Sequence, residues 1–202
     1  ILEFVAQCFV GEGDETVFGA QSFIVYKLAT IFMGGVCKSV PMPGMKYDLD
    51  AMRDAVTDKT KVVFMTNPNN PTGCVVKQSE VENFVRSLPE NVVFCYDEAY
   101  TEYQRDPVDL RGLISEGYNV ICLRTFSKIY GLAGLRIGYS YSSEEIAGYI
   151  NRVREPFNVN SLAQVAALAA LDDDDFVRLS RDVNDAGRKQ FEKAFEELGL
   201  EY

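Results

Sequence analysis

The sequence predicts an α/β fold in which a mostly parallel β-sheet lies between two layers of helices, a three-layer sandwich. Short runs such as VVFMT and VVFCY are nearly all apolar, without alternation, and rich in β-branched residues, which is typical of strands that are covered on both faces. These runs alternate with segments whose apolar residues recur at helical spacing, and that order favours a parallel sheet. The predicted strands are Val36–Pro41, Lys61–Thr66, Asn91–Tyr96, Asn119–Arg124 and Ile137–Tyr141.

The segments between these strands predict the covering helices, because their apolar residues follow the period of a helix and not that of a strand. The predicted helices are Ile1–Phe9, Gln21–Met33, Leu49–Val56, Gln78–Ser87, Ser143–Val153 and Ser161–Leu171.

The stretch from Asp172 to Leu198 has a different character. It opens with four aspartates, which suit the amino end of a helix, and its apolar residues then recur at helical spacing. We expect a long helix that leaves the core, with residues 1–171 forming a large domain and residues 172–202 leading to a small domain that is mostly absent. Because the chain begins at Ile1 in an apolar run, we expect it to be the central part of a longer protein.

Composition excludes several classes of function. The formal net charge of −10 argues against non-specific nucleic-acid binding, and no apolar stretch reaches the roughly 18 residues that a membrane helix needs. Five cysteines without CxxC or metal-ligand spacing predict free thiols in a reducing compartment, hence a cytoplasmic location. The chain has no histidine, which removes histidine-based triads and most zinc sites, and we expect no metal.

Three polar segments follow predicted strands, and ligands of open α/β sheets bind at the carboxyl ends of strands. The first is NPNNPTG, residues 67–73, in which two Asn-Pro steps and a glycine impose a rigid, irregular turn. Such a turn can hold an Asn side chain at a fixed angle to a ligand, although an ordinary loop is the alternative interpretation.

The second segment, DEAY, begins with Asp97 at the end of a buried strand. A carboxylate there is costly unless a cation or a hydrogen-bond donor accompanies it. A protonated pyridine nitrogen, a magnesium ion and a buried ion pair are all acceptable partners. Tyr100 can place a phenol near the same ligand or simply pack in the core.

The third segment is TFSKIYGLAGLRIGY, residues 125–139. Thr125, Ser127 and Arg136 together can bind a phosphate, with the arginine as a two-pronged donor. Lys128 would lie between that phosphate and the acidic strand end, where a desolvated amine can lose its proton and form a Schiff base. Taken singly, Lys128 can also be a solvated surface residue and Arg136 an ion-pair partner.

Together these segments resemble the fold type I pyridoxal-phosphate aminotransferases over essentially the whole chain. GDETV, SFIVYKLA, MKYDLDAM and REPFNVNS are similar to the subgroup that includes histidinol-phosphate aminotransferase. The resemblance implies the large domain of that fold, pyridoxal 5'-phosphate as cofactor, small-molecule substrates and a homodimer.

The resemblance also implies which residues carry the chemistry. Lys128 is similar to the lysine that holds the cofactor as an internal aldimine and then moves the proton at the substrate's α-carbon. Asp97 resembles the carboxylate that keeps the pyridine nitrogen protonated, so that the ring withdraws electrons. Tyr100 and Asn70 resemble the pair that hydrogen-bonds the phenolic oxygen of the cofactor.

Four further residues are implied to hold the cofactor in place. Thr125, Ser127 and Arg136 resemble the phosphate-binding residues of the family. Phe23 matches the aromatic position that stacks on the ring, although a core aromatic at a helix start is an equally good interpretation.

The function implied is a histidinol-phosphate:2-oxoglutarate aminotransferase of histidine biosynthesis with a ping-pong cycle. An aromatic amino-acid aminotransferase or a related decarboxylase is the alternative within the same chemistry. Outside it stand a non-catalytic module with this fold and an unrelated phosphate- or metal-binding domain that uses Asp97. Three departures lead us to expect that the chain by itself binds the cofactor weakly or is inactive. The family's glycine-rich amino-terminal segment and its carboxy-terminal domain are missing, and Gln21-Ser22 replaces the usual Pro-Ser or Pro-Thr.

Overall fold

The computed structural model describes all 202 residues, which divide into two compact units. The first unit comprises Ile1–Thr125 and Gly138–Asn158, and the second comprises Phe126–Ile137 and Val159–Tyr202. Along the chain, the first segment of the second unit is therefore the connection between two strands of the first unit.

The first unit is built on a six-stranded sheet with the strand order β2-β1-β3-β4-β5-β6. The pairs from β2 to β5 are parallel, and only β6 runs antiparallel to its neighbour β5. The predicted mostly parallel sheet is confirmed. The strands are β1 Glu15–Gly19, β2 Val36–Val40, β3 Thr60–Thr66, β4 Val93–Asp97, β5 Val120–Thr125 and β6 Gly138–Ser142.

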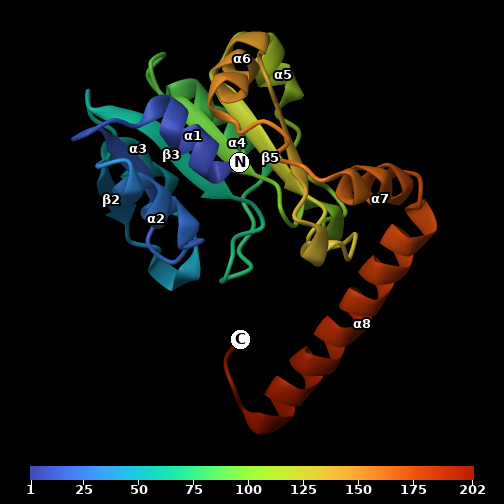
Figure 1. The fold of residues 1–202 in the computed structure, drawn as a ribbon. Coiled ribbons are helices and arrows are strands. Elements are labelled where there is room, and N and C mark those ends of the chain that lie inside the picture. Colours follow the sequence, from blue (N-terminus) through green and yellow to red (C-terminus); the bar gives the residue numbers. More distant parts are fainter. The chain divides into compact units, whose positions relative to one another are not determined.

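Helices cover both faces of this sheet, as Figure 1 shows for the first unit. One face packs against α1 (Leu2–Phe9), α2 (Val25–Phe32) and α6 (Glu144–Val153). The other packs against α3 (Leu49–Asp54), α4 (Gln78–Ser87) and α5 (Arg111–Ser115), with short 3₁₀ turns at Pro43–Met45 and Thr101–Tyr103.

The central strands explain why the apolar runs do not alternate. In β3, Val63 and Met65 belong to the cluster under α3 and α4, whereas Val62 and Phe64 belong to the cluster under α1 and α2. All four side chains are fully buried. Successive side chains of a strand point to opposite faces, so a strand between two helical layers needs apolar residues at every position.

Two elements are observed that the sequence did not predict, strand β1 and the short helix α5. All five residues of β1 are buried between β2 and β3, although the strand begins with Glu15 and Thr16. The Glu15 carboxylate accepts a 2.6 Å hydrogen bond from Thr57, and the Thr16 and Thr30 hydroxyls lie 2.7 Å apart. Strand β1 could not be recognised in the sequence because it is short and begins with two polar residues. Their hydrogen-bond partners are brought close only by the fold.

The second unit contains a short 3₁₀ turn (Ala133–Leu135) and the helices α7 (Ser161–Leu171) and α8 (Asp174–Leu198). The long helix expected at Asp172–Leu198 is thus observed two residues shorter at its start. The Asp173 side chain accepts a 2.9 Å hydrogen bond from the Phe176 amide, which explains that start as an N-cap. None of the helices is both long and apolar enough to span a bilayer.

Gly138 gives a stability prediction, because it pairs with Thr125 where β6 meets β5. A Cβ atom at this position would lie 2.6 Å from the Arg124 carbonyl oxygen. Neither β5 nor β6 can move away without breaking the hydrogen bonds between the two strands. We expect Gly138→Ala to lower the free energy of unfolding by about 3 kcal/mol, as overpacking does in a close-packed interior. Urea unfolding of the full-length protein measures this change.

The matched control is Gly148→Ala in α6, where an added Cβ meets nothing within 4 Å. Alanine there should raise the free energy of unfolding by up to about 1 kcal/mol, because it is the better helix former. Equal stabilities for the two variants would contradict the steric argument.

Candidate functional site

Asp97 is the last residue of β4, and its carboxylate is held in a defined orientation. The residue is only 8% exposed. Its Oδ2 accepts a 3.0 Å hydrogen bond from the hydroxyl of Tyr26, and its Oδ1 accepts a 3.0 Å bond from the Ala99 amide. Hydrogen bonds to a carboxylate favour its ionised form. The strand therefore ends in an oriented acceptor for a cationic or N–H group of a ligand.

Tyr26 is fully buried and locked in place by aromatic neighbours. Its ring stacks on Phe64 at 5.0 Å with an interplanar angle of 4°, and Phe23 meets it edge-on at 5.9 Å. Burial, together with the negative charge of Asp97, raises the pKa of Tyr26 well above its usual value, so the hydroxyl remains a donor.

The sequence did not single out Tyr26. The available signal was its position three residues after Phe23 in the predicted helix Gln21–Met33, since residues three apart share one face of a helix. The observed helix α2 begins only at Val25. The residue that this face contacts, Asp97, could be identified only from the folded structure.

The turn after β3 uses its asparagines in two ways. Asn67 and Asn69 are buried and hold the loop in place. Asn67 bonds both backbone groups of Val76, and Asn69 donates to the carbonyl of Gln21, before α2, at 2.7 Å. The Asn67-Pro68 and Asn70-Pro71 peptide bonds are cis.

Asn70 instead faces the end of β4. Its amide donates a 3.3 Å hydrogen bond to the hydroxyl of Tyr100, so these two predicted residues lie side by side. An amide and a phenol in contact can both donate to one oxygen of a ligand. Thr125 ends the adjacent strand β5, two residues beyond the Leu123 that pairs with Asp97.

The other predicted residues, Ser127, Lys128 and Arg136, belong to one loop of the second unit. This segment closes on itself through backbone bonds from the Phe126 amide to Ile137 (3.2 Å) and from Leu132 to Phe126 (2.9 Å). Along the chain, Lys128 comes three residues after the last residue of β5.

Arg136 has an unusual backbone conformation within this loop. Its φ of 57° is left-handed, which disfavours residues with a Cβ atom. The guanidinium donates to the Ala133 carbonyl at 2.8 Å, and the preceding Leu135 carbonyl accepts a 3.2 Å bond from Asn160. Asn160 also caps α7, so that helix supports the loop. Residues held in disfavoured backbone conformations cluster at active sites and ligand clamps, so this conformation makes the loop a candidate for ligand binding.

Comparison with known proteins identifies the group to which this arrangement belongs. Residues 1–202 match the model of the family described as aminotransferase class I and II. The chain belongs to this family.

Named relatives of this aminotransferase chain agree with the assignment. The chain is 48% identical over 204 residues to histidinol-phosphate aminotransferase 2 of Hydrogenovibrio crunogenus, and 47% identical over 205 residues to the histidinol-phosphate aminotransferase of Moorella thermoacetica. These alignments cover 100% of the chain but 55% and 53% of the relatives, so the chain spans about half their length.

Solved structures of aminotransferases confirm the predicted fold class. Histidinol-phosphate aminotransferase from Sinorhizobium meliloti, in complex with pyridoxal-5'-phosphate, superposes with a TM-score of 0.91 at 30% identity over 98% of the chain and 54% of that structure. The aromatic aminotransferase from Pyrococcus horikoshii superposes with a TM-score of 0.86 at 25% identity, over 99% of the chain and 56% of that structure.

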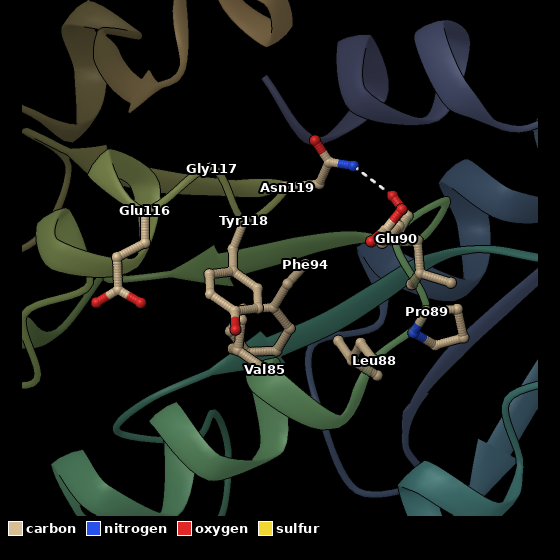
Figure 2. A pocket seen from close by; sticks show the side chains of 10 residues that line it. Val85, Leu88, Pro89, Glu90, Phe94, Glu116, Gly117, Tyr118 and Asn119 are labelled. Carbon is tan, nitrogen blue, oxygen red and sulfur yellow. Dashed lines mark hydrogen bonds between the residues drawn. The ribbon is translucent and has the colours of Figure 1, made fainter.

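The pocket drawn in Figure 2 lies elsewhere in the aminotransferase fold. It has a volume of about 680 Å³ and is lined by residues near the amino ends of β4 and β5, among them Phe94 and Asn119. Glu116 on its rim is paired with Arg86 at 2.6 Å. No predicted site residue lines this pocket, which lies at the amino ends of β4 and β5, whereas Asp97 lies at the carboxyl end of β4. No cluster of three or more acidic or cysteine side chains is arranged to hold a metal ion.

Proposed function

We propose that the whole protein is a pyridoxal-phosphate-dependent aminotransferase that exchanges an amino group between histidinol phosphate and 2-oxoglutarate. The observation that carries this proposal is the buried Asp97 carboxylate, oriented by Tyr26 at the end of β4. The named relatives, 47–48% identical to this chain, support the choice of substrate.

The residues of the first unit fit the ring of such a cofactor. Asp97 would hold a proton on the ring nitrogen, because an ionised, oriented carboxylate is a strong acceptor for it. Asn70 and Tyr100, in contact at 3.3 Å, would donate to the phenolic oxygen. Phe23 would lie against the ring face. When bound, pyridoxal phosphate supplies a protonated ring that withdraws electrons from the bonds of the substrate's α-carbon.

Residues that follow β4 in the sequence would bind the phosphate of the cofactor and attach the cofactor covalently. Thr125, Ser127 and Arg136 would bind the phosphate through two hydroxyls and a guanidinium. Lys128 would hold the cofactor covalently through Nζ and, when the substrate amine has taken that place, move the proton at the substrate's α-carbon. A neutral amine is needed for both tasks, and a nearby positive charge favours it.

The rest of the proposal concerns the whole protein. We place it in the cytoplasm as a homodimer, with residues 1–171 in the cofactor-binding domain and residues 172–202 leading into a smaller domain. We expect the smaller domain to supply an arginine for the substrate's carboxylate or phosphate, as the resemblance to the family implies.

Reductive trapping tests the proposal on the full-length protein. The protein is loaded with pyridoxal phosphate, treated with borohydride and digested, and the peptides are analysed by mass spectrometry. We expect the phosphopyridoxyl mass on the peptide that contains Lys128, and amino transfer from histidinol phosphate faster than from phenylalanine or tyrosine. Labelling of Lys128 with faster turnover of the aromatic amino acids would support the aromatic aminotransferase instead. No labelled peptide would contradict both.

Arg136 gives a prediction that separates its backbone strain from its binding role. Both Arg136→Ala and Arg136→Gly remove the guanidinium, so both should weaken cofactor binding by about 10- to 100-fold, the worth of a charge-assisted hydrogen bond. Only glycine accepts the left-handed backbone without strain. The glycine variant should therefore be more stable than the alanine variant by about 1 kcal/mol. Urea unfolding of the apoprotein and an absorbance titration with pyridoxal phosphate measure the two effects, and unchanged cofactor affinity in both variants would remove Arg136 from the site.

A further inference from the structure

Glu98, next to Asp97, is the most deeply buried acidic side chain of the first unit, with a side-chain exposure of 0%. It lies on the opposite side of the sheet from Asp97: its partner Tyr141 packs against the cluster under α3 and α4, whereas the Asp97 partner Tyr26 belongs to the cluster under α1 and α2. The proposed function assigns Glu98 no role.

Its contacts tie three strands together at one edge of the sheet. Glu98 Oε2 lies 2.6 Å from Nε of Arg124 in β5, and the hydroxyl of Tyr141 in β6 lies 2.8 and 3.0 Å from the two carboxylate oxygens. The Arg124 guanidinium also lies 5.9 Å from the centre of the Tyr141 ring. The Glu98 amide adds a 2.8 Å bond to the Leu123 carbonyl of β5. Each partner therefore holds the others in one arrangement.

Stability is a weak reason for such a network. Removing a carboxylate and a guanidinium from water opposes the gain from their attraction, and apolar side chains of similar size often stabilise a protein as well or better. Burial accordingly raises the pKa of Glu98 despite the hydrogen bond from Arg124. What an ion pair adds over an apolar contact is a fixed direction and distance between two backbones.

The network lies next to two residues of the proposed site, just beyond Asp97 and Leu123, the last residues paired between β4 and β5. Glu98 directly follows Asp97, which would face the ring nitrogen, and Arg124 directly precedes Thr125, which would face the phosphate. These groups would bind opposite ends of one rigid cofactor, so their spacing decides whether both can bind at once.

We propose that Glu98, Arg124 and Tyr141 are positioning residues that set the spacing between Asp97 and Thr125 for the cofactor. This inference rests on the proposed function. The three residues touch neither substrate nor cofactor in this role. They act through the strand ends to which they belong.

The test replaces Glu98, Arg124 and Tyr141 together by apolar residues in the full-length protein, as Glu98→Leu, Arg124→Met and Tyr141→Phe, so that none of the three is left without its partners. Glu102, whose carboxylate lies 3.9 Å from Arg124, loses only this long contact. We expect the apoprotein to keep its unfolding midpoint, while the dissociation constant for pyridoxal phosphate rises by about tenfold or more because the site loses its orientation. We also expect a shift in the pH at which the absorbance of the bound cofactor changes. Tyr141→Phe, which keeps the ring and the ion pair, should give a smaller change in the same direction.

The matched control is Glu116→Gln. It breaks the exposed Glu116–Arg86 pair at the other end of the strands and should leave both readouts unchanged. A triple variant that is less stable but binds the cofactor with wild-type affinity and wild-type pH dependence would overturn the inference and leave the proposed function standing. Wild-type protein that binds no pyridoxal phosphate would overturn both.

Discussion

Lys128→Ala in the full-length protein is expected to lower the rate of amino transfer by about 10⁴-fold or more, because one amine both holds the cofactor and moves the proton at the α-carbon. The variant should also give no phosphopyridoxyl peptide after borohydride treatment. Lys128 is exposed and three residues beyond β5, so its truncation removes few packing contacts and the fold should persist. Steady-state rates, with circular dichroism as a check of folding, measure the outcome.

Two controls separate the amine from the positive charge. Lys128→Arg keeps the charge but offers a group that stays protonated and cannot attack an aldehyde, so it should lose as much activity as the alanine variant. Lys59→Ala removes another exposed lysine just before β3, at the amino end of the strands, and should change the rate less than about twofold. Lys128→Arg with substantial activity would contradict covalent attachment through this residue.

The sheet could be predicted from the sequence where burial on both faces left a pure apolar signal. Strand β3 shows this most clearly, since Val62 to Met65 are all fully buried. Strand β1 could not be found in the same way, because Glu15 and Thr16 obtain their hydrogen-bond partners from segments distant in the sequence. Hydrophobic periodicity assumes that polar side chains are exposed. A polar side chain that is buried with a hydrogen-bond partner violates this assumption.

The candidate site shows the same division. Asp97 closes an apolar strand and Asn70 lies in the turn after another, so the rule that ligands bind at strand ends was sufficient to select their segments. The choice of Asn70 among the three asparagines of its turn came from the family resemblance. The structure then added the contact between Asn70 and Tyr100. Tyr26 and Glu98 were not predicted as site residues because only their tertiary contacts distinguish them. For Tyr26, that contact is the hydrogen bond from its hydroxyl to Asp97. The catalytic roles of these residues remain predictions until the variants are measured.

Asp97→Asn is expected to lower the turnover number by about 10³-fold, within the range found when a group that holds or moves a proton is removed. Asparagine has nearly the same shape but cannot keep a proton on a ring nitrogen by its charge. It also suits the local contacts less well, because both carboxylate oxygens accept hydrogen bonds, from Tyr26 and from the Ala99 amide, and an amide offers only one oxygen. Turnover within a few-fold of the wild-type value would show that Asp97 has no such role.

Tyr26→Phe extends this experiment, because it leaves the carboxylate in place and removes only the hydroxyl that orients it. Loss of one hydrogen bond to a charged group should lower the turnover number by about tenfold, well short of the asparagine variant. The phenylalanine ring can keep the stacking on Phe64, so stability should change little by comparison. Since the pKa of Tyr26 lies well above its usual value, the hydroxyl donates throughout the neutral range, and the deficit should be the same at each pH there. A deficit that varies across neutral pH would contradict a purely orienting role, because either Tyr26 or the Asp97 to which it donates would then titrate in the reaction.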